Sequence, residues 1–296
     1  MQHCIITLTE AWELFTLECR SRRLTASSID FYRWRLQPFI VHCTESGVTT
    51  LDGIDAPLIR RYLVQLHERD LSEYSVHAAA RAIRRWLNFC VAEELLDASP
   101  MRKVKMPTLN RPILPALSDV DIRHIIATCH IRRDKAIVYI LLDTGLRAAE
   151  LVSLNGSDID LHTGAIIVTG KGRKERHVYL SPSSQRELRR YYRQRGRPPH
   201  NGPVFRSERN GQRLTRSGLF QLMRRLARSS GVPNCKPHTF RRTFALTMLR
   251  QGCDLYTLQH LMGHEDVQML RRYLAISDDD AQAAHDRYSP VAALLP

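Results

Sequence analysis

Apolar side chains recur every three or four residues over most of the chain, which is the period of an amphipathic α-helix. In residues 25–43 this period runs through Ile29, Tyr32, Leu36 and Phe39, after a Thr-Ala-Ser-Ser run that can cap a helix. Residues 72–96 repeat the pattern, and so do shorter stretches near 7–20 and 56–68. The first hundred residues therefore predict a four-helix bundle.

A different pattern begins at residues 103–117, KVKMPTLNRPILPAL, which hold three prolines and no helical period, as is typical of a linker. Beyond it, GAIIVTGKGRKERHVYLS predicts two short strands around a Gly-Lys-Gly turn. Ser118 and Asp254 are candidate helix caps. The remaining periodic stretches predict helices at about 119–129, 132–143, 146–154, 183–195, 214–230, 238–251, 254–262 and 266–275.

The composition is that of a folded, globular chain, with 43% hydrophobic and 25% charged residues. The N-terminal residues lack the basic flank and apolar run of a signal peptide, and no apolar stretch approaches the length that spans a bilayer. The seven cysteines are scattered, without a C-x-x-C pair. This predicts a protein of the reducing cytoplasm, with neither a disulfide framework nor a zinc site.

Net charge narrows the class of partner. The chain carries a formal charge of +14, and the excess lies in its second part: residues 1–110 hold 14 basic and 13 acidic side chains, against 30 and 17 in residues 111–296. Such a balance predicts a polyanionic partner, nucleic acid by default, although a merely basic, solvated surface is common. On the helix of residues 72–96, Arg81, Arg84 and Arg85 share one face, either to contact DNA or as a solvated stripe.

Two short stretches of the basic part carry candidate phosphate ligands. In TGLRAAELVSL, Gly145 ends a helix, so Arg147 is predicted in the first turn of the next one, with Glu150 three residues later. Arg147 can there clamp a phosphate, although taken alone a surface Arg–Glu pair is the better interpretation. In GKGRKER, glycines flank Lys171, which can donate a proton in a groove or contact phosphate non-specifically; the two interpretations balance.

Two further stretches add histidines and a tyrosine. In PHTFRRTFALTMLRQG, His238 and Arg241 fall on one helix face, and the alternative is a solvated basic helix end. In LMGHEDVQMLRRYL, His264 follows a helix and Tyr273 lies on the next one. A lone tyrosine is more commonly a half-buried core residue, and Tyr288 in HDRYSP is a competing candidate.

Taken together, these residues suit one reaction. A tyrosyl oxygen that attacks a phosphodiester needs cations around the pentacoordinate phosphorus, a base for its own proton and an acid for the departing 5′ oxygen. Guanidinium and imidazole groups can stabilise that charge, and each well-placed donor is worth about 3 kcal/mol in the transition state. A covalent intermediate conserves the phosphodiester energy, so strands can be rejoined without ATP.

The motifs TGLRAAEL, GKGRKER, HTFRRTFA and LMGHEDVQMLRRYL, in this order, closely resemble the tyrosine recombinases of the phage integrase family, especially short Xer-type members. The resemblance covers essentially the whole chain. It implies a mainly α fold with a small β-sheet, in which residues 1–105 form a helical-bundle, SAM-like core-binding domain. Residues 106–117 would be the linker, and residues 118–296 the catalytic domain.

The resemblance also implies which residues act as nucleophile and which transfer protons. Tyr273 would be the nucleophile that forms a 3′-phosphotyrosyl bond. Lys171 would protonate the leaving 5′ hydroxyl, and His238 would assist proton transfer from the tyrosine.

The phosphate ligands follow from the same resemblance. Arg147 and Arg241 would bind the scissile phosphate, His264 would hydrogen-bond it, and Glu150 would orient the site. Further DNA contacts are expected from the basic helix face and the hairpin, namely Arg81, Arg84, Arg85, Arg173 and Lys174. No metal and no cofactor are expected. The expected partner is double-stranded DNA, on which the protein would assemble as a tetramer and pass through a Holliday junction, with no part for a membrane.

Three alternatives compete with a recombinase. A DNA-binding regulator could use residues 238–262 as a helix-turn-helix, although Lys171, His264 and Tyr273 would then have no purpose. A type IB topoisomerase shares the phosphotyrosine chemistry. A metal nuclease would have to use the acidic run 278–280, which is more simply a solvated helix start.

Overall fold

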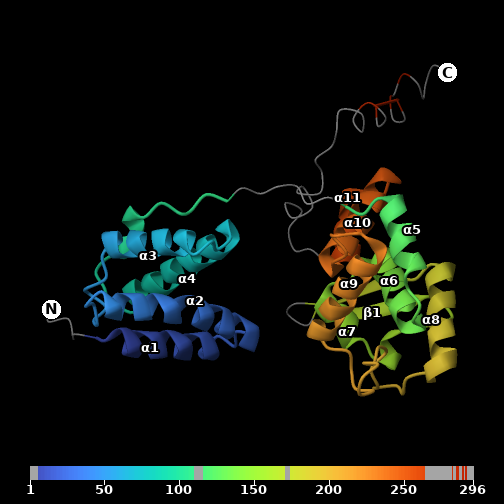
Figure 1. Cartoon of the computed structure of the whole chain (residues 1–296), viewed down its shortest axis with the longest axis horizontal. Helices are drawn as coiled ribbons and strands as arrows, with labels where there is room; N and C mark the ends of the chain where they lie inside the picture. The colour runs from blue at the N-terminus through green and yellow to red at the C-terminus, as the bar shows by residue number, and fades with distance from the viewer. Residues whose placement is uncertain are drawn as a thin grey trace. The chain divides into compact units, whose positions relative to one another are not determined.

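The structure is a computed structural model that describes residues 6–109, 116–170 and 174–263, together with Gln282, His285, Asp286, Ser289 and Val291. The chain divides into two compact units, residues 1–112 and residues 113–296 (Figure 1). In the described part of the chain no helix is both long enough and apolar enough to cross a membrane.

The first unit is a bundle of four helices, as predicted. They are α1 (Leu8–Ser21), α2 (Ala26–Glu45), α3 (Ala56–Glu68) and α4 (Glu73–Ala92), followed by the short 3-10 turn η1 (Pro100–Lys103). The predicted end of the fourth helix near residue 96 is wrong by four residues. Glu94 takes a left-handed φ of 57°, and the Leu95 N–H turns back to donate to the Cys90 carbonyl at 2.8 Å. The chain thereby leaves the helix so that Leu95 packs against the core of the unit.

The core of this unit is centred on α4. Trp86 is fully buried, and its indole N–H donates to the Ala11 carbonyl of α1 at 3.2 Å. On the opposite side of α4, Arg81, Arg84 and Arg85 are exposed, and the Arg81 guanidinium lies 5.4 Å from the centre of the Phe31 ring. The helix therefore has the apolar face and the basic face that its sequence predicts.

The two ends of the predicted linker belong to different cores. Val104 is buried in the first unit, and Met106 packs against it. Leu117 is buried in the second unit, where its N–H donates to the Thr243 hydroxyl at 2.9 Å.

The second unit is mainly α-helical with a small sheet, which confirms the predicted fold class. Strands β1 (Ala165–Thr169) and β2 (Glu175–Tyr179) pair antiparallel, with Ile167 opposite His177. Helix α6 (Arg132–Thr144) packs against α8 (Pro182–Arg195) and α10 (Pro237–Arg250) (Figure 1). The other helices are α5 (Asp119–Ala127), α7 (Ala148–Ser153), α9 (Arg216–Ser230) and α11 (Leu255–Met262), with the 3-10 turn η2 (Gly156–Asp158) after α7. The helix predicted at 266–275 lies outside the described residues.

Both predicted caps hold the ends of their helices. The Ser118 hydroxyl accepts from the Asp121 N–H at 3.1 Å, and the Asp121 carboxylate accepts from the Ser118 N–H at 2.9 Å. The Asp254 carboxylate accepts from the backbone N–H groups of Tyr256 and Thr257 at the start of α11. Since these side chains satisfy N–H groups that have no partner within the helix, they fix where α5 and α11 begin.

Candidate active site

The candidate site starts at the glycine that ends α6. Gly145 has a φ of +59°, and a Cβ added to it would lie 2.5 Å from Cδ1 of Phe244. Only glycine combines this conformation with that approach. Two residues later, Arg147 is the N-cap of α7 in extended conformation, one position before the predicted first turn. The difference arises because the Glu150 carboxylate accepts from the backbone N–H of Arg147 at 2.8 Å, which places the helix start after Arg147.

Glu150 is a buried anion, with only 6% of the residue exposed. Its two carboxylate oxygens accept four hydrogen bonds: from the Arg147 backbone N–H and Nη1, both at 2.8 Å, and from Nη1 and Nη2 of Arg176, both at 2.9 Å. Burial alone would raise the pKa of Glu150, but the hydrogen bonds and charges of Arg176 and Arg147 outweigh it and lower the pKa to about 2. A surface Arg–Glu pair, the better interpretation when the stretch is taken alone, is therefore wrong.

Arg176 is the residue that the sequence analysis missed. It is buried on β2, and besides holding Glu150 it donates from Nε to the carbonyl of Leu261 at 2.8 Å. Its signal in the sequence was the two-residue period of the strand, because Arg176 shares the buried face of β2 with Val178. A charged side chain at an inward position of a strand predicts a buried partner.

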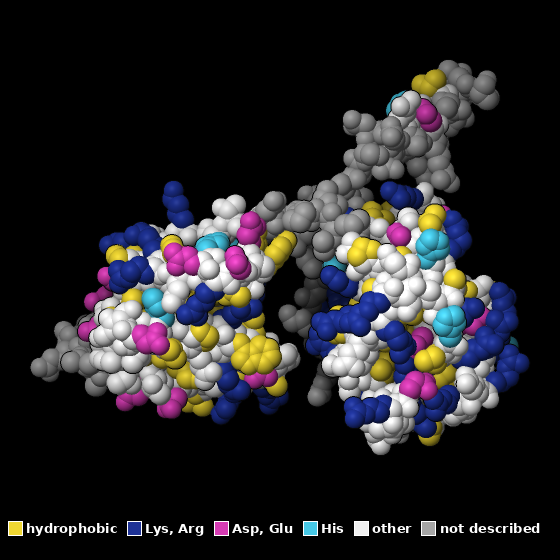
Figure 2. Space-filling model, viewed as in Figure 1, with side chains coloured by type: hydrophobic (Ala, Val, Ile, Leu, Met, Phe, Trp, Pro, Cys, Tyr) yellow, Lys and Arg dark blue, Asp and Glu magenta, His cyan; other side chains and the backbone are white. Residues whose placement is uncertain are grey.

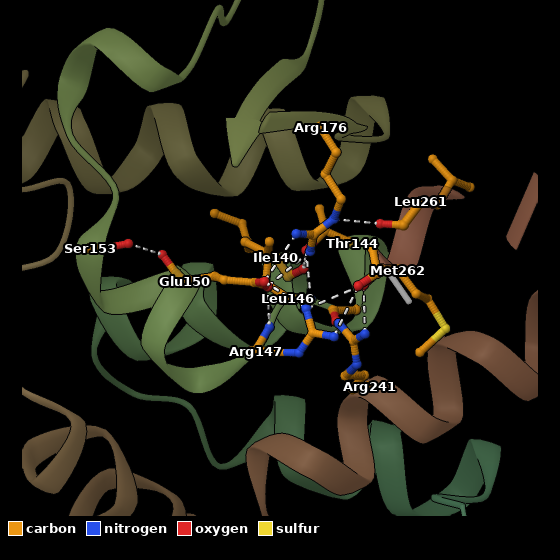
Figure 3. Close-up of polar contacts among 12 residues, drawn as sticks. Ile140, Thr144, Leu146, Arg147, Glu150, Ser153, Arg176, Arg241, Leu261 and Met262 are labelled. Atoms are coloured by element: carbon orange, nitrogen blue, oxygen red, sulfur yellow. Dashed lines mark hydrogen bonds and ion pairs between the residues drawn. The ribbon is translucent and has the colours of Figure 1, made fainter. Parts of the chain in front are cut away.

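Three arginines from different elements converge on the end of α11 (Figure 3). Arg241 donates from Nη1 to the Gly145 carbonyl and from Nη2 to the Met262 carbonyl, both at 2.7 Å. Arg147 donates to the Met262 carbonyl at 3.4 Å and to the Gly263 carbonyl at 3.1 Å. With Arg176 on Leu261, three successive carbonyls at the C-terminus of the helix accept from guanidinium groups. These carbonyls lack partners within the helix and carry its partial negative charge, so cations are stabilised there.

The three arginines differ in what they offer to a ligand. Arg241 is 3% exposed and Arg176 is 6% exposed, whereas 41% of the Arg147 side chain is accessible. Gly263, with a φ of +61°, leaves room for the Arg176 side chain, from which an added Cβ would lie only 3.0 Å away. The three arginines therefore form a cationic cluster in which Arg147 has the accessible guanidinium.

His238 lies in the first turn of α10, one turn before Arg241, and is exposed. Partial desolvation lowers the pKa of its imidazole, and the positive charges of Arg241 and Arg242 lower it further. The ring is therefore kept neutral near pH 7, in the form that can accept a proton.

Comparison with known proteins identifies the family. Residues 116–280, more than half of the chain, match the model described as the phage integrase family. The chain belongs to this family. It is 28% identical to a tyrosine recombinase XerD of Listeria monocytogenes over 92% of the chain and 95% of that protein. It is 25% identical to a tyrosine recombinase XerC of Bacillus pumilus over 92% of the chain and 93% of that protein. The resemblance seen in the motifs is confirmed: the chain is a tyrosine-type site-specific recombinase.

Solved structures agree with this assignment. The crystal structure of XerA recombinase matches this chain with 25% identity and a TM-score of 0.54, over 95% of this chain and 99% of the XerA chain. A Tn1549 transposon integrase in complex with a circular intermediate DNA gives a TM-score of 0.74 at 19% identity, over 94% of the chain and 98% of that protein. The second likeness shows the fold alone.

The structure of this recombinase brings together Arg147, Glu150 and Arg241 from the predicted set. Lys174 lies at the described edge of the hairpin, where its carbonyl accepts from the Gly170 N–H at 2.8 Å. The remaining predicted site residues lie outside the described residues, namely Lys171, Arg173, His264 and Tyr273. Among the described residues, no three His, Cys, Asp or Glu side chains are grouped to hold a metal ion. The acidic run 278–280 also lies outside them.

Proposed function

We propose that this recombinase cleaves and rejoins DNA strands at specific sites through a 3′-phosphotyrosyl intermediate, with Tyr273 as nucleophile. One observation carries the proposal. Arg147 and Arg241 come from different helices, yet both donate to the carbonyl of Met262, so their guanidinium groups occupy one small volume. That carbonyl lies two residues before His264. A phosphodiester oxygen that takes its place would meet two cationic donors at once.

Glu150 and Arg176 support this phosphate site without touching the substrate. The bidentate pair between them holds the carboxylate in place, and the carboxylate in turn fixes both the backbone and the guanidinium of Arg147. A guanidinium that is held in advance loses little freedom when it binds the phosphate, which favours the transition state over the free enzyme.

Proton transfer is assigned to the remaining predicted residues. The neutral imidazole of His238 would take up the phenol proton as the tyrosyl oxygen attacks phosphorus, and Lys171 would give a proton to the departing 5′ oxygen. His264 would hydrogen-bond a non-bridging oxygen. The tyrosyl ester retains the energy of the broken phosphodiester, so attack by a 5′ hydroxyl reverses the step and needs neither ATP nor a metal ion.

The first unit would clamp the DNA. Its exposed arginines on α4 share one helix face and suit phosphate contacts. The same role is proposed for the basic hairpin. These residues are Arg81, Arg84, Arg85, Arg173 and Lys174. Residues 1–105 would thus be the core-binding domain and residues 118–296 the catalytic domain. A solved structure of similar fold is a lambda integrase dimer bound to a core site. For this chain we infer a cytoplasmic protein that forms a tetramer on two DNA sites and exchanges strands through a Holliday junction.

The test is a covalent complex. The substrate is a duplex that carries the crossover site and a nick close to the scissile phosphate. Cleavage then releases a short fragment that bears the 5′ hydroxyl, and because this fragment diffuses away, the tyrosyl intermediate cannot be resealed. The wild type is expected to yield a protein–DNA adduct that survives SDS, with EDTA present. Y273F should bind the same duplex but give no adduct, and the matched variant Y288F should behave as the wild type.

Three outcomes decide between the alternatives. An adduct with Y273F and none with Y288F would move the nucleophile to Tyr288. Relaxation of a supercoiled plasmid without exchange between two sites would indicate a type IB topoisomerase. Binding without any adduct in the wild type would indicate a DNA-binding regulator.

A further inference from the structure

The outward face of α8 and the turn after it is densely basic. All six arginines of residues 182–197 are exposed, and the one acidic residue of this segment, Glu187, is buried. In Figure 2 dark-blue side chains gather along the edge of the second unit where Figure 1 places α8. The six are Arg186, Arg189, Arg190, Arg193, Arg195 and Arg197.

This face is distinct from the candidate active site. Helix α8 packs its Leu188, Tyr191 and Tyr192 into the core of the second unit and lies against α6. In Figure 1 α7, whose N-cap is Arg147, lies on the other side of α6. The function proposed above leaves the arginines of α8 without a role.

Much of this charge is not neutralised within the unit. Arg190 pairs with Glu187 and Arg195 pairs with Glu208. Among the described residues, Arg186 donates to the hydroxyl of Ser183 alone, at 2.8 Å, and Arg189 donates to the carbonyl of Leu161 and the side-chain oxygen of Gln185. In the described part of the chain neither Arg193 nor Arg197 forms a hydrogen bond or an ion pair. The segment thus presents at least three guanidinium groups that pair with no carboxylate of the described residues.

Concave surfaces accompany the charge. Arg193 stands between two clefts: Arg189 and Arg197 line the first with it, and Arg132 and Arg190 line the second. Three guanidinium groups line each cleft, but the carboxylate of Glu208 also lines the second, so the first is the more cationic. Planar guanidinium forks bind phosphate oxygens in pairs, which makes such clefts suited to a phosphate backbone.

We propose that the α8 face binds the phosphate backbone of a second DNA duplex segment, outside the crossover site. Arg186, Arg190 and Arg193 lie on one face and rise about 10 Å along the helix, which spans about three phosphates of one DNA strand. A protein partner fits less well, because residues 182–197 expose no large hydrophobic side chain to anchor it. The proposal goes beyond strand cleavage and would give the recombinase two DNA surfaces.

The test is a bridging assay that needs no knowledge of the crossover sequence. A biotinylated duplex of arbitrary sequence is fixed on beads, the full-length protein is added, and a second, fluorescent duplex is supplied in solution. The wild type is expected to hold both duplexes. The variant R186Q/R193Q/R197Q should still be retained by the fixed duplex but should capture about a hundred-fold less of the second one near 0.1 M salt, because three phosphate contacts are lost. None of these three arginines pairs with a carboxylate of the described residues, so the fold should persist.

A matched control removes the same charge elsewhere. R123Q/R228Q/R250Q replaces three exposed arginines on α5, α9 and α10 and should bridge as the wild type does. If this control loses as much bridging, the loss reflects the lower net charge and not the α8 face, and the proposal is overturned. Wild-type bridging by R186Q/R193Q/R197Q would do the same, since protein–protein contacts would then join the duplexes. If beads that carry poly-glutamate retain the wild type but not this variant, while no duplex is bridged, the partner is an acidic protein and the proposal fails.

The assay also separates this inference from the proposed function. Formation of the covalent adduct on a nicked site should be unchanged in R186Q/R193Q/R197Q. Loss of bridging with normal adduct supports the second surface, and loss of the adduct in Y273F bears only on the nucleophile.

Discussion

Replacing Glu150 by Gln removes the charge of the buried carboxylate while keeping its shape. The carboxylate accepts four hydrogen bonds, two at each oxygen, and the amide nitrogen of glutamine can accept none of them. Two donors therefore lose their acceptor, and the guanidinium groups of Arg147 and Arg176 lose their counter-charge. Arg176, being buried, has little access to water in compensation.

Two independent arguments give the magnitude of this loss. The pKa of Glu150 falls from 4.5 to about 2 on folding, which corresponds to a stabilisation of the charged form by about 3 kcal/mol. Removal of one partner from a buried ion pair costs about 3–5 kcal/mol in other proteins. For a unit of this size, a loss of about 3 kcal/mol lowers the unfolding temperature by about 6–12 °C.

Scanning calorimetry of the full-length protein measures this effect, because the two units can unfold in separate transitions and only that of the second unit should move. The matched control is E187Q, the same substitution at another buried carboxylate of that unit. Glu187 accepts from Arg190, whose side chain is 46% exposed, and its second oxygen has no hydrogen-bond partner. We expect E187Q to cost less than about 1 kcal/mol. If E150Q shifts the transition no further than E187Q does, the carboxylate does not hold the arginine cluster together.

Three further outcomes follow from the site. Because the pKa of Glu150 is depressed, its stabilisation is complete above about pH 4.5 and disappears as the pH falls towards 2, so acid titration of the unfolding free energy should show this loss in the wild type and not in E150Q. Gly145→Ala should destabilise the protein by about 1 kcal/mol for the left-handed backbone plus the clash with Phe244, whereas G231A, at a φ of +72° with nothing within 4 Å, should cost only the former, as measured by urea unfolding. The lowered pKa of His238 predicts that kcat/KM for cleavage of a nicked duplex falls on the acid side only below pH 6.5, and that H238Q loses this limb of the pH profile.

Local patterns were sufficient for most of the fold. The helical period and a capping side chain such as Ser118 or Asp254 act within a few residues, so the starts of α5 and α11 could be predicted from the sequence. The end of α4 could not. Glu94 adopts a left-handed conformation because Leu95 gains burial against the rest of the bundle, and such a gain depends on contacts that no local pattern encodes.

The candidate site divides in the same way. The spacing of Arg147 and Glu150 predicts that they meet, since three residues separate them on one turn of chain. The burial of Glu150 depends on β2, because this strand supplies Arg176 from 26 residues away in the sequence. The spacing of Arg147 and Glu150 alone therefore does not predict that their ion pair is buried. The two-residue period of β2 would have identified Arg176 as inward-facing. For Lys171, His264 and Tyr273 the assignments remain predictions.

The arrangement of the arginines bears on how a phosphate could enter. At the end of α11, Arg147 and Arg241 both donate to the neutral carbonyl oxygen of Met262, and Arg147 donates to that of Gly263 as well as to the Glu150 carboxylate. A phosphate oxygen offers a guanidinium a full opposite charge and bidentate geometry, whereas a carbonyl oxygen offers only a partial charge. A phosphodiester could therefore displace these carbonyls more readily than it could displace a carboxylate, which would compete with its full charge. The carboxylate of Glu150 shares its four hydrogen bonds equally between Arg147 and Arg176, so its charge is not spent on Arg147 alone. Because the displaced carbonyls close α11, just before His264, phosphate binding and the position of the following segment should be coupled.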